Sequence, residues 1–330
     1  MHLGHIFTYM PAWSKILSSL VSSLFPGRHF SEKYVEAFTM AFYNPFARRE
    51  SHSQYSLTAY RVLAPLSWAL VVVVGIYYSI HEPSDVSNSW TIWSQLERQF
   101  TAFSVNVTVV EIYWVVLLLS QIFYLFQLFN KDTAIVALAA NSAAHFILNN
   151  LFVVAWILLW TRNHFWPAEI IVIAHFINQH LLFWRIRTLP PISHVAVVAG
   201  PYAWTLITLF WTGSAAVRSH NLASNITANV FLWIIFLIGS IHIFLAVDDL
   251  LGYSLSLLTF GLAVAQTSRK SHLHLQWIFA WVIFGVFLLD SLYVTSAKYV
   301  GRNVLFRSPR ESESSDAERA PLLNDATAPA

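Results

Sequence analysis

The chain has 330 residues, of which 56% are hydrophobic and only 11% charged, whereas a soluble domain has about 25% charged residues. The mean hydropathy is +0.55, and several separate apolar runs approach the roughly 20 residues needed to cross a bilayer, so the composition predicts an all-α, polytopic transmembrane bundle rather than a soluble fold. The net charge of +2 is too small to indicate nucleic acid as a partner, and the absence of cysteine excludes disulfides, thiolate metal sites and cysteine nucleophiles.

Residues 1–61 form the first of three predicted regions and are expected on the cytosolic side. From Trp13 to Phe25, apolar residues recur at helical spacing with serines between them, and Lys15 is the only charge. This pattern predicts an amphipathic helix that either lies in the membrane interface, with lipids as partners, or packs on the protein's own spans.

Three cations, Arg48, Arg49 and Arg61, stand immediately before the first predicted span. Cations in this position are typical of the cytosolic side of a membrane protein. Contact with lipid head groups is the alternative role.

Residues 62–297 form the second region, in which we predict eight membrane-spanning helices. Their expected bounds are Val62–Ile80, Val107–Phe129, Ala134–Trp160, Trp166–Trp184, Val195–Val217, Ala228–Val247, Leu250–Gln266 and Leu275–Ala297. The seventh is short and follows directly after two aspartates, so a re-entrant or buried segment is the alternative there.

The distribution of lysine and arginine predicts the orientation of these spans. With both termini in the cytosol, fourteen of the 19 Lys and Arg residues lie on the cytosolic side and five on the other. This bias follows the positive-inside rule and requires an even number of spans. The longest internal loop, His81–Asn106, then faces the lumen or the exterior.

Two of the predicted spans carry stripes of polar residues at helical spacing. The third span contributes Asn141, His145 and Asn149, and the fourth contributes His175, Asn178 and Gln179. Polar groups in hydrocarbon are unfavourable unless they find partners, so we expect both stripes to face protein, or water held inside the protein. The histidines either relay protons or bind a metal, or they only form hydrogen bonds between helices.

Three carboxylates fall within predicted spans: Glu111 in the second, Glu169 in the fourth and Asp290 in the eighth. Intramembrane carboxylates are candidates for functional groups. Glu111 and Glu169 lie near span ends and can instead reach the head groups, whereas Asp290 lies deeper and can instead be an interior hydrogen-bonding group.

Residues 298–330 form the third region, a polar tail expected to be disordered and cytosolic. Glu318 stands four residues before Leu322 and Leu323, the pattern of an acidic dileucine sorting signal read by an adaptor. This pattern predicts the vacuolar membrane, reached by the secretory route, as the address.

No sequence pattern indicates an enzyme or a cofactor. The chain has no P-loop, no Gly-rich dinucleotide motif and no zinc signature. Gly252-Tyr-Ser254 superficially matches the Gly-x-Ser of intramembrane serine proteases, but the companion glycine-flanked histidine is missing.

Several stretches of the sequence are distinctive in combination. They are Asn44-Pro-Phe-Ala-Arg-Arg-Glu-Ser with Tyr60-Arg61, His145-Phe-Ile-Leu-Asn-Asn150, Gly200-Pro-Tyr-Ala-Trp204, Leu275-Gln-Trp277 and Glu318-Arg-Ala-Pro-Leu-Leu. Over roughly residues 40–325 the chain thereby resembles a family of fungal multi-pass membrane proteins catalogued as domain of unknown function 1774. The resemblance implies a fungal source and a similar helical membrane core, and it implies no activity or catalytic residue.

Two functions of different classes follow from these observations. The first is an endomembrane protein that carries a small solute or protons through a polar interior lined by the two stripes. The second is a structural or scaffolding protein whose polar residues only join helices together. A lipid-modifying membrane enzyme is a third class, for which no motif argues.

Overall fold

The computed structural model describes residues 44–186, 189–217, 222–268 and 275–300, apart from the side chains of 222–225. The chain divides into two units, Met1–Ala47 and Arg48–Ala330. Of the first, only residues 44–47 are described, and they form a turn in which the Ala47 N–H donates to the Asn44 carbonyl (3.1 Å). The predicted amphipathic helix and the predicted sorting signal both lie outside the described residues.

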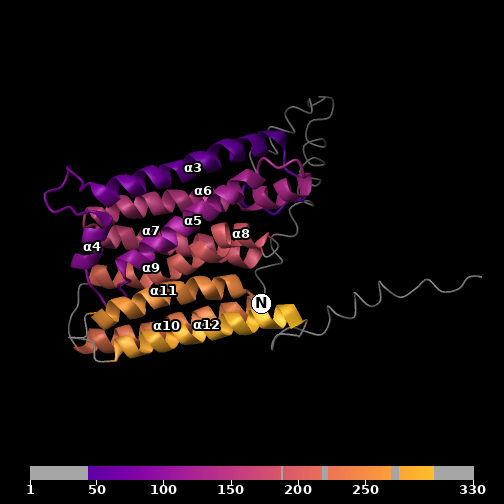
Figure 1. Cartoon of the computed structure of the whole chain (residues 1–330). Helices are drawn as coiled ribbons and strands as arrows, with labels where there is room; N and C mark the ends of the chain where they lie inside the picture. Colours follow the sequence, from indigo (N-terminus) through magenta and orange to yellow (C-terminus); the bar gives the residue numbers. More distant parts are fainter. Residues whose placement is uncertain (1–43, 187–188, 218–221, 269–274, 301–330) are drawn as a thin grey trace, which may run out of the picture. The chain divides into compact units, whose positions relative to one another are not determined.

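The second unit is helical throughout its regular structure as far as it is described (Figure 1). Its elements are α3 (Gln54–Ile80), α4 (Ile92–Arg98), α5 (Val107–Gln127), α6 (Thr133–Thr161), α7 (Phe165–Arg185), α8 (Pro191–His194), the π-helical turn η1 (Val195–Ala199), α9 (Gly200–Val217), α10 (Leu222–Ala246), α11 (Asp249–Ser268) and α12 (Gln276–Val300). The predicted fold class is therefore observed, and α8, η1 and α9 together replace the fifth predicted span.

Seven helical segments of the described chain are long and apolar enough to cross a membrane, so the protein is an integral membrane protein. The shortfall from eight concerns α7, whose Glu169, two histidines and two amides lower its hydropathy. The uncertain seventh span is a full 20-residue helix, α11, that qualifies. Helix α7 has 21 residues, about 31 Å at 1.5 Å per residue, which matches a hydrocarbon core of about 30 Å.

Polar caps fix where three of the helices begin. The Ser53 hydroxyl accepts the N–H of Ser56, so α3 starts at Gln54 rather than at the predicted Val62. Asn106 and Asp132 cap α5 and α6 in the same way. Side-chain oxygens at this position satisfy N–H groups that have no partner inside the helix, and residues 54–61 therefore belong to the first helix.

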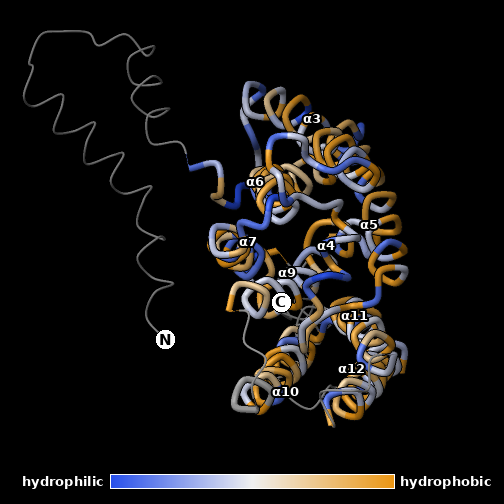
Figure 2. The backbone as a smooth tube through the Cα atoms, turned by 90° about the vertical axis from the view of Figure 1, so that its left-hand side faces the viewer, coloured by the Kyte–Doolittle hydropathy of each residue, from blue (hydrophilic) through white to orange (hydrophobic). Residues whose placement is uncertain are grey.

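The long helices lie side by side, with α9 innermost. Figure 2 looks along them and shows α3 and α6 at one side, α7 and α9 in the middle, and α10, α11 and α12 at the other. Helix α6 packs on α3 and α7, and α7 packs on α9. In the most apolar 18-residue stretch of α8–α9, 83% of the residues are buried, whereas in that of α3 only 17% are. Lipid can therefore reach α3 far more readily than α9.

The α8–η1–α9 segment is one helical run with a π-helical turn near its start. The Gly200 N–H donates to the Val195 carbonyl, five residues back, and Pro201 has no N–H to continue the pattern. Gln121 of α5 supplies the missing donor, because its Nε2 lies 3.2 Å from the Ala196 carbonyl oxygen. Neighbouring helices commonly satisfy backbone groups freed by proline in this way.

Gly200 also permits the close approach of α5 to this turn. The Tyr113 hydroxyl donates to the Gly200 carbonyl (2.7 Å). A Cβ atom at this position would lie 2.7 Å from Leu117 Cδ1 and 2.7 Å from the Val195 oxygen. Only glycine fits without a shift of α5 or of the backbone.

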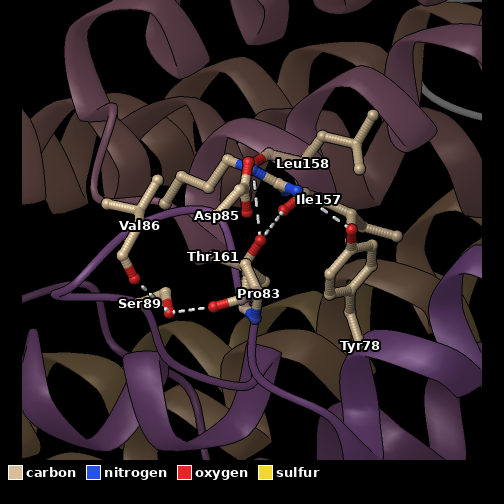
Figure 3. A network of polar contacts seen from close by, with 9 residues as sticks. Tyr78, Pro83, Asp85, Val86, Ser89, Ile157, Leu158 and Thr161 are labelled. Carbon is tan, nitrogen blue, oxygen red and sulfur yellow. Dashed lines mark hydrogen bonds and ion pairs between the residues drawn. The ribbon is translucent and has the colours of Figure 1, made fainter.

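At the α4 end of the bundle, the loop after α3 is fixed to the end of α6 (Figure 3). Arg162 Nε donates to Asp85 (2.9 Å), and its Nη2 donates to the Tyr78 hydroxyl (3.0 Å). The Ser89 hydroxyl lies 3.0 Å from the Val86 carbonyl, and the Trp90 N–H donates to the Thr161 carbonyl (3.1 Å). The hydrogen bond from Arg162 holds the pKa of the Asp85 carboxyl below its ordinary value.

Candidate functional site

The polar stripes of α6 and α7 meet in the interior. Asn149 Oδ1 accepts hydrogen bonds from His175 Nε2 (2.5 Å) and Gln179 Nε2 (2.6 Å). An amide oxygen only accepts, so His175 carries its proton on Nε2. The Asn149 amide donates in turn to Asn150 Oδ1 (3.2 Å), and Asn150 Nδ2 donates to Ser67 on α3 (3.1 Å). The cluster therefore joins three helices.

One turn away, His145 and Asn178 form a second link between α6 and α7. His145 Nδ1 lies 2.7 Å from Asn178 Oδ1, and Asn178 Nδ2 donates to the His145 carbonyl (3.1 Å). Together with the Asn149–His175 pair, this link sets an antiparallel register, in which a step toward Asn141 on α6 accompanies a step toward Arg185 on α7.

The last member of the α6 stripe, Asn141, holds the segment before α3. Its Oδ1 accepts the Arg49 N–H (2.7 Å), and its Nδ2 donates to the Arg49 carbonyl (2.9 Å). His52 Nε2 lies 3.2 Å from the same Oδ1. All six stripe residues are at most 5% exposed, so the expected burial of the stripes away from lipid is observed.

The three intramembrane carboxylates do not join this cluster. Asp290 of α12 accepts a hydrogen bond from Ser240 of α10 (3.1 Å). Glu169 is partly buried on α7 with its carboxylate against Gly213 of α9, and its Oε2 is buried without a hydrogen-bond partner. Glu111 is partly buried on α5. Asp290 is therefore hydrogen-bonded to α10 rather than to either stripe.

A second polar cluster, which the sequence analysis missed, lies between α7, α9 and α10. The Tyr202 hydroxyl is 3.0 Å from His180 Nδ1 and 3.0 Å from His242 Nε2. His242 Nδ1 donates to the Ile238 carbonyl (2.7 Å), so in the neutral ring its Nε2 accepts from Tyr202. Tyr202 is then free to accept from His180, which gives a directed chain His180–Tyr202–His242.

A buried ion pair lies at the end of α8. His194 Nε2 is 2.7 Å from Asp248 Oδ2, and the two side chains are 9% and 10% exposed. Asp248 Oδ1 also accepts the Leu251 N–H (3.1 Å) and so caps α11. Burial raises the pKa of Asp248, but the hydrogen bond and charge of His194, the Leu251 N–H and the charge of Lys298 outweigh it, so the pKa lies below its ordinary value.

This pair borders a pocket of about 170 Å³. Phe183, Leu189 and Pro191 line one side of it, and residues 246–250 and Lys298 line the other. Lys298 and Asp249 form a second ion pair at the pocket. Val247 adopts a positive φ of 55°, an uncommon conformation for a β-branched residue, and this turn aims both aspartates at the pocket.

Sequence reasoning could have found part of these two clusters. His242 is an ionisable residue within an apolar run, which is a signal for a functional site in itself. Asp248 and Asp249 stand between two spans and were interpreted only as a boundary. No group of three or more histidine and carboxylate side chains in the described part of the chain is placed to hold a metal ion.

Comparison with known proteins gives one match. Residues 225–323 match the model of DUF1774, described as a fungal protein of unknown function. No curated protein and no solved structure matches. The match includes α10 from residue 225 onward, α11 and α12, and extends into the tail, whereas the resemblance noted in the sequence extended over roughly residues 40–325. Residues 225–323 of this chain are thus similar to the DUF1774 family of fungal proteins.

Proposed function

We propose that the protein carries protons, or a small protonatable solute, across a fungal endomembrane. The observation that supports this most directly is the directed chain His180–Tyr202–His242, which lies next to the His194–Asp248 pair and its pocket. Ionisable groups inside a membrane protein are unfavourable and typically mark a proton or substrate path.

The His180–Tyr202–His242 chain and the pocket beside Asp248 are close enough for a proton to pass from one to the other. Phe183 lines the pocket, and its ring centroid lies 5.5 Å from that of His242. The Phe183 ring also stacks on Tyr202, with a centroid distance of 5.0 Å. A rotation of this one side chain would connect the pocket with the Tyr202 chain, so Phe183 is the proposed gate.

Polar groups continue along α9 toward the other end of the bundle. Thr205 and Thr208 follow Tyr202 at helical spacing and are 0% and 2% exposed. The Thr208 hydroxyl and Glu169 Oε2 are buried without hydrogen-bond partners. We therefore propose that the path continues from Tyr202 along α9 toward Glu169, whose carboxylate lies against Gly213 of the same helix.

The π-helical turn Val195–Ala199 provides the proposed hinge for such a carrier. His194 lies before the π-helical turn and Tyr202 follows it. Bending at the turn would therefore change the distance between the pocket and the His180–Tyr202–His242 chain. π-Helical turns often occur at functional sites.

Proton flux into liposomes tests the proposal. The purified full chain would be reconstituted with a pH-sensitive dye inside, and a potassium diffusion potential would drive the flux. We expect flux above that of empty liposomes, with most of it lost in Tyr202→Phe, which keeps the ring but removes the hydroxyl. Asp85→Asn, an exposed change at the α4 end, is the matched control. Wild-type flux equal to that of empty liposomes would exclude proton carriage.

A structural or scaffolding role is the second candidate, and the pairing of the α6 and α7 stripes favours it. Their amides and imidazoles bond chiefly to one another and to the segment before α3, as expected for groups that join helices. A scaffold would give no flux in either variant or wild type.

The proposed address is the vacuolar membrane, with both termini in the cytosol. It rests on the charge bias and on Glu318, Leu322 and Leu323, which a sorting adaptor would recognise.

A further inference from the structure

We infer a binding site for a phosphate group at the end of α7, formed by Arg185 together with Arg48. The site lies apart from the proposed proton path and does not depend on it. Arg185 is the last residue of α7, and Arg48 lies in the segment that leads into α3.

The register of α6 and α7 places Arg185 beside this segment. The His145–Asn178 link puts Arg185 two turns further along α7, level with the part of α6 that carries Asn141. Asn141 holds the Arg49 backbone through two hydrogen bonds. Arg48 directly precedes Arg49, so these hydrogen bonds also hold the backbone of Arg48 near α6.

The charges of Arg48 and Arg185 interact without a carboxylate between them. The two guanidinium groups are near enough to repel each other. Tyr60 and His145 are the other titratable side chains that interact electrostatically with Arg185. In the described part of the chain, neither Arg48 nor Arg185 forms an ion pair. Glu50 lies nearby in sequence, but it is exposed.

Arg185 also has an unused donor. Its Nη2 is buried and has no hydrogen-bond partner, although buried donors are nearly always paired. A guanidinium presents a planar fork of donors that fits phosphate oxygens. A phosphate would bond this donor and separate the two like charges, whereas a neutral ligand would leave the repulsion in place.

The source of the phosphate is either a lipid head group or a soluble phosphate. Arg185 ends α7 and Arg48 precedes the start of α3 by six residues; cations that flank membrane helices commonly meet lipid head groups. Purified wild-type protein in dodecyl maltoside would be melted, with tryptophan fluorescence as the signal, in the presence of dioctanoyl phosphatidate, dioctanoyl phosphatidylcholine or inorganic phosphate.

We expect phosphatidate to raise the melting temperature and phosphatidylcholine to leave it unchanged. A rise with inorganic phosphate as well would assign the site to soluble phosphates, and a rise with phosphatidate alone would assign it to lipid. Each cation near a membrane surface contributes about fivefold to the binding of an anionic partner. Arg48→Gln, at an exposed position, should therefore raise the phosphatidate concentration that gives half of the melting-temperature shift by about that factor.

Matched variants keep the test decisive. Arg185→Gln removes charge and fork together, whereas Arg185→Lys keeps the charge and loses the fork, so the second should bind with intermediate affinity. Lys131→Gln removes an exposed cation from the loop between α5 and α6 and should bind like wild type. The inference is wrong if no probe shifts the melting temperature, or if Lys131→Gln weakens binding as much as Arg48→Gln.

Discussion

Replacing Asn149 with leucine tests how much the α6–α7 cluster contributes to stability. Leucine has the same number and branching of side-chain heavy atoms as asparagine, with two methyl groups in place of the amide oxygen and nitrogen, so the change chiefly removes hydrogen bonds. Two of these join α6 to α7, from His175 and Gln179, and one lies within α6, to Asn150. The amide of Asn149 is 2% exposed, so water does not readily replace it.

The expected loss can be estimated from the two interhelical bonds. Such bonds in membrane proteins contribute about 0.6 kcal/mol on average and at most about 1.7 kcal/mol. Asn149→Leu should therefore lower the free energy of unfolding by about 1.2 kcal/mol, with about 3.4 kcal/mol as the upper limit. Asn150→Leu removes a single interhelical bond, to Ser67, and should lower it by about 0.6 kcal/mol.

Unfolding of the purified proteins by sodium dodecyl sulfate in mixed micelles, followed by tryptophan fluorescence, measures both values. The ratio between the two variants carries the test, because both share the same α6 environment. A loss at Asn149 that does not exceed the loss at Asn150 would contradict the reasoning. In the flux assay, Asn149→Leu removes activity if the stripe lines the path, and otherwise lowers it only in proportion to the folded fraction.

Gly200→Ala should lower the free energy of unfolding by about 1–3 kcal/mol, because the new methyl group overpacks the contact with α5, whereas Gly75→Ala, with no atom within 4 Å of its new Cβ, should not destabilise. Detergent unfolding compares them. The hydrogen bond from Arg162 lowers the pKa of Asp85 in the folded protein, so the contribution of this carboxylate to stability is present above its ordinary pKa and is lost as the pH falls through the lowered pKa. Hydrogen-exchange protection factors in its loop, which correct for the pH dependence of intrinsic amide exchange, should therefore decrease in that acidic range and stay constant at higher pH. A reporter at the C-terminus should be cytosolic by protease protection, and a luminal reporter would overturn the even span count. Replacing Leu322 and Leu323 with alanine should move a fluorescent fusion to the cell surface or an earlier compartment; an unchanged location would make the motif a chance match.

Helix positions were predictable because apolar length and polar caps act locally. Most predicted bounds lie within a few residues of the observed ones, and Asn106 and Asp132 stand where α5 and α6 begin. The start of α3 was not predictable from hydropathy, because its first two turns contain polar residues outside the apolar run. Ser53 caps the start of the helix through a hydrogen bond from the Ser56 N–H, which a hydropathy profile does not detect.

The partners of the polar residues were only partly predictable. Spacing placed Asn149 and His175 on single helix faces, and the prediction that these faces meet agrees with the structure. The relay was not predictable, because Tyr202 and His242 lie on helices whose packing the sequence pattern does not specify. The π-helical turn depends likewise on Gln121, a residue from another helix that compensates for Pro201.

Helix α7 is the predicted span that is not apolar enough to be counted among the seven. Its polar residues point inward in two directions: His175 and Gln179 bond to α6, and His180 bonds to Tyr202 of α9. Lipid therefore meets mainly its remaining apolar residues, of which Ile170, Ile177 and Leu181 are exposed. A helix covered by neighbouring helices on two sides needs only a narrow apolar strip to lie in a bilayer. The residues that face its neighbours can be polar, and they lower its mean hydropathy. Helix α7 connects the end of α6 to the start of α8 through short links. Its crossing of the membrane is the one that the predicted even number of spans requires in addition to the seven apolar helical segments.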